Sequence, residues 1–107
     1  MGIDVQVDLY LMANLSPLFT GLPFVVWISV RGGAKHDIRV KVSKGPKAQS
    51  FITVALRPEL RVVGDGKLST KEMNMLKRWV ARNWDVLLAY WNVEIYTEQA
   101  MLSLQKI

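Results

Sequence analysis

The stretch from Leu22 to Val42 constrains the fold of this chain more than any other. It contains two runs rich in β-branched and aromatic residues, Phe24 to Val30 and Ile38 to Val42, with Gly32 and Gly33 between them. Such runs are typical of β-strands, and glycine supplies the positive φ angles that a short turn between two strands requires. The stretch therefore predicts a β-hairpin.

The two strands of this hairpin differ in their patterns. The first is apolar on both faces, which favours a central place in a sheet. The second alternates strictly, so its three aliphatic residues face inward while Arg39 and Lys41 share the outer face. We expect a basic stripe on this strand.

Further strands flank the hairpin. Residues Phe51 to Leu56 and Leu60 to Val63 predict two strands joined by a turn at Arg57-Pro58-Glu59. Before the hairpin, Ile3 to Met12 favours an edge strand, with a helix as the competing interpretation, and Asn14 to Pro23 has the proline and glycine content of a loop.

The periodicity changes to that of helices near Ser69. Ser69 and Glu72 have the spacing of a capping box, and apolar residues then recur at helical intervals. We expect Asn83 to interrupt this helix, a second helix to run from Trp84 to Asn92, and Thr97 to cap a last short helix. The expected packing anchors between helices and sheet are Trp79, Trp84 and Trp91.

These elements predict one α+β domain over residues 1–107. Short connections favour an antiparallel β-meander of about four strands, packed on one face by two or three C-terminal helices. The chain has 107 residues, which is enough to bury a core without disulfides or metals.

Composition excludes several classes of site. The chain has no cysteine and one histidine, so disulfides, thiol nucleophiles and zinc sites of the Cys/His type are excluded. We expect no catalytic residue, metal or cofactor. The acidic start and the shortness of the longest apolar run predict neither export nor membrane insertion, and we expect a cytoplasmic location.

The C-terminal half, Gly66 to Trp91, resembles a small bacterial family catalogued as domain of unknown function 4160. The landmarks of the resemblance are Gly66, Leu68, Trp79, Leu87, Leu88 and Trp91. His36 matches the first of two histidines that the family usually carries one residue apart, but Ile38 stands at the second position, which places a paired-histidine metal or phosphate site in doubt. The resemblance implies this fold and no established activity. It also implies a gene that looks like one half of a two-gene pair, similar to toxin–antitoxin arrangements.

The candidate site is the basic hairpin of residues 31–47. It holds six basic residues and one acid, Asp37, while the rest of the chain carries as many acids as bases. No aromatic residue is interleaved among the basic ones. His36 and Asp37 are the one local pair with the residue types of acid–base catalysis. Within a strand the two side chains would point to opposite faces, whereas in the turn Asp37 could orient the His36 imidazole. The expected contact residues are Arg31, Lys35, His36, Arg39, Lys41, Lys44 and Lys47.

Two functions remain open for this surface. One is a non-enzymatic module that binds a protein partner or a second copy of the chain. The other is a nucleic-acid-binding protein whose basic hairpin meets phosphates and makes binding salt-dependent. A third interpretation gives the basic residues no partner, because solvent-facing strands also carry lysine and arginine for solubility and to deter edge pairing.

Overall fold

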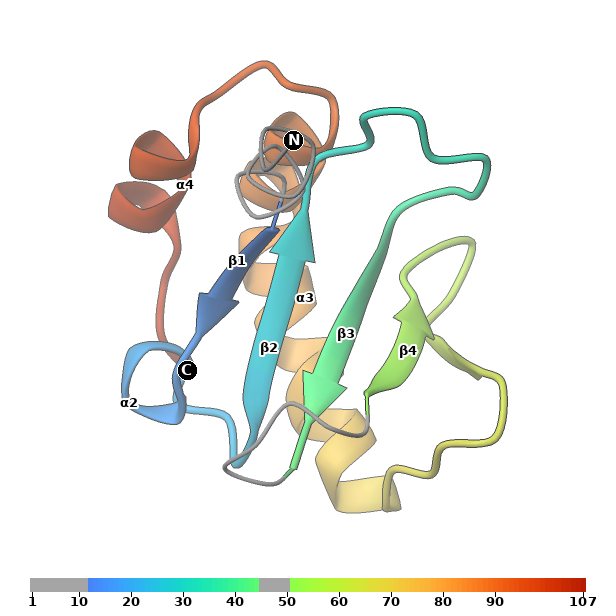
Figure 1. The fold of residues 1–107 in the computed structure, drawn as a ribbon. Helices are drawn as coiled ribbons and strands as arrows, with labels where there is room; N and C mark the ends of the chain where they lie inside the picture. The colour runs from blue at the N-terminus through green and yellow to red at the C-terminus, as the bar shows by residue number, and fades with distance from the viewer. Residues whose placement is uncertain (1–11, 45–50) are drawn as a thin grey trace, which may run out of the picture.

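The computed structural model describes residues 12–44 and 51–107. It contains a five-stranded antiparallel sheet in the order β1-β2-β3-β4-β5, with the long helix α3 across one face (Figure 1). The strands are β1 (Met12–Leu15), β2 (Val25–Ser29), β3 (Arg39–Ser43), β4 (Ile52–Ala55) and β5 (Arg61–Val63), and the helices are α2 (Pro17–Thr20), α3 (Thr70–Trp91) and α4 (Thr97–Ser103). The α+β meander expected from the sequence is confirmed, with five strands where about four were expected.

The core lies between the inner face of the sheet and α3. On β3 the expected alternation is confirmed, because Val40 and Val42 are 2% and 0% exposed while Arg39 and Lys41 lie on the opposite face. On the helix, Leu76 and Trp79 are fully buried against this apolar layer. Removing these large side chains from water is the main stabilising contribution to the fold.

The start of the described chain differs from the expected loop over Asn14 to Pro23. The first residues of that expected loop belong to β1. This strand pairs with β2, and Leu15 lies directly opposite Val26. Ser16 then caps α2, where its hydroxyl accepts a hydrogen bond from the Phe19 amide. A serine cap followed by proline at the first helical position begins a helix, and this signal was outweighed by the loop composition. Of the expected strand Ile3 to Met12, all but Met12 lies outside the described residues.

Helix α3 is continuous, so the expectation that Asn83 interrupts it is wrong. The Asn83 side chain is buried, and its Nδ2 donates to the carbonyl oxygens of Trp79 and Gln105, both at 2.9 Å. Its Oδ1 accepts from the Gln105 amide at 2.6 Å. Asparagine is unfavourable inside helices because its side chain competes for backbone groups. Here the two bonds with Gln105 join the helix to the C-terminal segment.

The two helix starts differ in how well the sequence predicted them. The capping box at α3 is confirmed: the Ser69 hydroxyl accepts from the Glu72 amide, and the Glu72 carboxylate accepts from the Ser69 amide. At α4 the cap position is Tyr96, whose amide donates to the Gln99 side chain. Thr97 is the first helical residue, and its hydroxyl lies 2.9 Å from the Tyr90 hydroxyl.

Candidate interaction surface

The outer face of the sheet, opposite α3, gathers side chains from all five strands. Cross-strand pairing aligns one row of residues, in which each is directly opposite the next: Asn14, Trp27, Lys41, Thr53 and Val63. A neighbouring row aligns Arg39 with Ala55 and Ala55 with Arg61. Because residues directly opposite one another share a face, Lys41, Arg39 and Arg61 are cations of one surface.

Two aromatic rings lie among these cations. The rings of Trp27 and Phe51 meet edge to face, with centroids 5.5 Å apart and planes 87° apart. Lys41 Nζ lies 5.6 Å from the centroid of the Phe51 ring, within the range of a cation–π contact. The basic stripe expected on β3 therefore lies beside aromatic rings contributed from outside that strand.

The same face contains a hollow of about 250 Å³. Its described lining combines cationic, aromatic and hydroxyl side chains and includes no carboxylate, and consists of Met12, Trp27, Ser29, His36, Arg39, Lys41 and Thr53. Two of these residues leave a buried N–H donor unpaired in the described structure: Trp27 at Nε1 and Arg39 at Nε. Both atoms are buried, and it is the partly exposed cations and hydroxyls of the lining that favour an anionic or acceptor-rich ligand.

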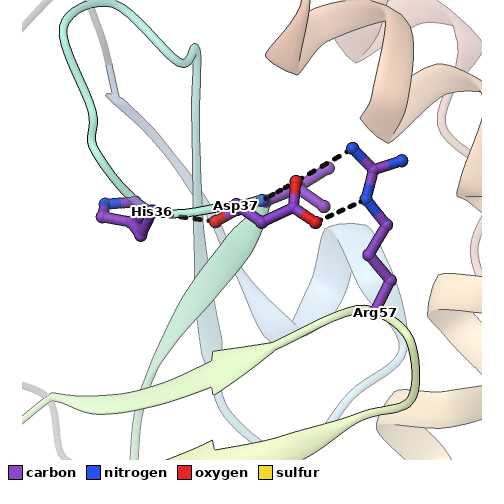
Figure 2. A network of polar contacts seen from close by, with 4 residues as sticks. His36, Asp37 and Arg57 are labelled. Carbon is purple, nitrogen blue, oxygen red and sulfur yellow. Dashed lines mark hydrogen bonds and ion pairs between the residues drawn. The ribbon is translucent and has the colours of Figure 1, made fainter.

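The loop between β2 and β3 is tied to the rest of the fold through Asp37 (Figure 2). The Asp37 carboxylate accepts from Arg57 Nε at 2.6 Å and from Arg57 Nη2 at 2.9 Å, and it also accepts from the Ile38 amide. The hydrogen bond from Arg57, with that from Ile38, lowers the pKa of Asp37 to about 2. Asp37 is thereby committed to a structural ion pair.

The His36 ring does not contact the Asp37 carboxylate, which faces Arg57. His36 Nδ1 is 2.9 Å from the backbone oxygen of Asp37 (Figure 2). The centroid of the His36 ring is 5.7 Å from that of the Trp91 ring. Both residues lie in the loop before β3, where the sequence left a contact between them open, and there the two side chains diverge. They do not form the carboxylate–imidazole pair that acid–base catalysis uses.

The expected contact residues do not form one continuous patch. Arg39 and Lys41 lie on the outer face, and Arg31 and Lys35 are exposed in the β2–β3 loop, where the Arg31 amide donates to the Trp91 oxygen at 2.9 Å. Lys44 instead forms an ion pair with Glu72 at the start of α3.

In that ion pair, Lys44 Nζ lies 2.9 Å from Glu72 Oε1. The bond from Lys44, together with the Ser69 amide, lowers the pKa of Glu72. Lys44 is thus partly neutralised, and Lys47 lies outside the described residues. The described basic residues of the hairpin therefore lie on different parts of the surface.

Sequence reasoning missed the residues that complete this surface. Trp27, Phe51, Thr53 and Arg61 come from other strands or from strand ends, outside the 31–47 hairpin. A signal for Trp27 existed, because its position in the alternation of the first strand puts it on the face opposite Val26. The cross-strand partners depend on register, which the sequence did not specify.

Within the described ranges, no group of three histidine, aspartate or glutamate side chains could hold a metal ion. The helices of that same part of the chain include none with both the length and the apolar character needed to cross a membrane. No protein-family model, curated protein or solved structure matches this chain significantly. The resemblance to domain of unknown function 4160 remains an expectation.

Proposed function

We propose that this protein is an interaction module that binds single-stranded nucleic acid on the outer face of its sheet. The observation that carries the proposal is that Trp27 lines one hollow together with Lys41 and Arg39, while the Phe51 ring contacts Trp27 and Lys41 next to that lining. Aromatic rings stack on bases of any sequence, while lysine and arginine meet the phosphates. The formal net charge of +5 favours the approach of a polyanion.

A single strand suits this surface better than a duplex. Stacking on Trp27 or Phe51 requires an unpaired base whose ring face is accessible, which a duplex hides within its stack. The hydroxyls of Ser29 and Thr53 line the same hollow and can bond base edges or sugar oxygens. The proposal assumes the cytoplasmic location expected from the sequence, where single-stranded RNA is available.

The test is a fluorescence-anisotropy titration of a labelled mixed-sequence single strand of about 12 nucleotides, a length within the site sizes of single-strand-binding folds. We compare the wild type with Arg39→Gln/Lys41→Gln at about 50 and about 200 mM salt. We expect about tenfold weaker binding in the variant and a salt slope smaller by about two phosphate contacts.

The matched control is Lys71→Gln/Arg78→Gln, which removes the same charge from exposed positions on α3. This variant should bind within about twofold of the wild type, since only the diffuse field of the protein changes. Equal losses in the two double variants would show that net charge alone attracts the strand. No binding at the lower salt would contradict the proposal.

A separate variant, Phe51→Leu, tests stacking without changing charge. We expect about tenfold weaker binding, because base stacking on an aromatic ring contributes on the order of 1–3 kcal/mol. If the partner is instead an acidic protein, the wild type should bind the oligonucleotide only weakly. Phe51→Leu and the charge variants should then bind it with the same weak affinity. Size-exclusion chromatography would then reveal the complex.

A further inference from the structure

A second hollow lies between the β4–β5 turn and the exposed flank of α3. It measures about 240 Å³, and its floor includes Leu56 and Val80, each 4% exposed. Pro58, Leu60 and Trp84 complete the apolar lining. We refer to this hollow as the α3 groove. Its surface suits a bulky apolar side chain, because burying such a side chain removes apolar area from water on both partners.

Two cations flank the apolar lining of the α3 groove. Arg57 Cζ lies 6.0 Å from the centroid of the Trp84 ring, and Lys77 of α3 lines the same hollow. Arg57 also holds Asp37, so its charge is partly matched. Lys77 is exposed and has no ion pair in the described structure, and no described residue lining the groove is acidic. The rim is therefore positive above an apolar floor.

The α3 groove is distinct from the outer face of the sheet. None of the residues that line it lines the hollow around Trp27, and α3 contributes four of its lining residues: Lys77, Val80, Ala81 and Trp84. A ligand here would touch neither Arg39 nor Lys41. The two surfaces can be altered one at a time.

We propose that the α3 groove binds a short acidic segment of a protein partner that inserts one bulky apolar side chain between Pro58 and Trp84. The apolar floor selects the inserted side chain, and Lys77, which has no ion pair in the described structure, selects a carboxylate beside it. Charge complementarity of this kind sets the choice of partner and the rate of association. A nucleotide is the less suitable occupant because most of the lining is aliphatic, which offers contact area without stacking.

The probe is a labelled hexapeptide, Glu-Glu-Leu-Phe-Glu-Glu, followed by fluorescence anisotropy. We expect saturable binding with a dissociation constant below about 1 mM. Binding should be at least about tenfold weaker for Glu-Glu-Gly-Ser-Glu-Glu, which lacks the apolar side chains, and for Lys-Lys-Leu-Phe-Lys-Lys, which reverses the charge. Equal binding of the three peptides, or no binding of the first below about 1 mM, would overturn the proposal.

Variants of neighbouring residues locate the binding. Lys77→Glu should weaken binding of the acidic peptide about tenfold, and Ala81→Glu should do the same by placing a carboxylate in the groove. Arg78→Glu is the matched control, because it changes the charge equally on the same helix but does not line the groove. It should change the affinity by less than about threefold. Equal losses in Lys77→Glu and Arg78→Glu would refute the assignment.

Two further measurements separate this groove from the outer face. The Arg39→Gln/Lys41→Gln variant should bind the acidic peptide as the wild type does. An excess of the unlabelled 12-nucleotide strand should leave the peptide bound. Displacement by the oligonucleotide, or loss of peptide binding in that variant, would place the peptide on the outer face and overturn the assignment.

Discussion

The role assigned to Asp37 changes once its contacts in the structure are known. In the sequence it stands next to His36 and forms the one pair with the residue types of acid–base catalysis. In the structure its carboxylate binds Arg57, which also lies against Trp84. This arrangement ties the β2–β3 loop to the β4–β5 turn and, through Trp84, to α3. Asp37, the one acidic residue of the basic hairpin, therefore has a structural role.

The ion pair predicts a specific pH dependence. The pKa of Asp37 is lowered to about 2 in the folded chain, below the value near 3.9 of an unfolded aspartate. Its contribution to stability is thus fully present above about pH 4 and is lost as the pH falls toward 2. A carboxyl-carbon NMR titration should give a midpoint near pH 2, rising toward 4 in Arg57→Gln. A midpoint unchanged by Arg57→Gln would show that the arginine does not lower the pKa.

At the scale of elements, α3 organises the molecule. It is 22 residues long, starts with a complete capping box, and buries a stripe that includes Leu76, Trp79 and Leu87 against the sheet. Its other side carries cations, among them Lys71, Lys77 and Arg78. One helix thus contributes apolar residues to the hydrophobic core and Lys77 to the rim of the α3 groove. The division follows from helical periodicity, which separates an apolar from a charged face.

Asn83 within this helix leads to a stability prediction. Asn83→Ala removes the three bonds to Trp79 and Gln105 and should lower the free energy of unfolding by about 2 kcal/mol. Asn74→Ala is the control, because Asn74 is exposed on the same helix and its loss should change stability by less than about 0.5 kcal/mol. Urea denaturation measures both. Equal effects would mean that the bonds to the C-terminal segment contribute nothing.

At the scale of the whole molecule, segments distant in the sequence close against one another. The C-terminal segment leaves α4 and runs beside α2, where the Ile107 amide donates to the Thr20 oxygen at 2.9 Å (Figure 1). Arg82 also donates to the Lys106 oxygen, so the segment is held by α3 as well. This closure places the backbone of Ile107 directly against Gly21.

Substitutions of two glycines with similar φ angles distinguish the cost of backbone strain from the cost of a steric clash. Gly21 and Gly64 have φ angles of +85° and +94°, where a side chain is strained by about 1–2 kcal/mol. Gly64→Ala should cost only that amount, since no atom lies within 4 Å of its added Cβ. Gly21→Ala should cost at least about 1 kcal/mol more because its Cβ overlaps the Ile107 oxygen. Thermal melts compare them, and equal losses would show that the C-terminal backbone moves away freely.

Local patterns predicted much of the fold correctly. The alternation in β3, the capping box at Ser69 and the hairpin are confirmed because each depends on residues close in the chain. The prediction failed at Asn83 and at the loop expected over Asn14 to Pro23. At Asn83 the deciding partner, Gln105, lies far along the chain, whereas in the expected loop a local helix start at Ser16 and the pairing of β1 with the nearby strand β2 were missed. Tertiary contacts overrode the local propensity at Asn83.

The same division holds for the surfaces. By itself, the sequence determined that Arg39 and Lys41 share a face and that this region is basic, since side-chain direction on a strand alternates with every residue. Only the tertiary structure decided that Trp27 lies opposite Lys41, that Lys44 pairs with Glu72, and that an apolar groove forms under Trp84. The reason is geometric: strand register and helix packing bring together residues whose separation along the chain carries no periodic signal.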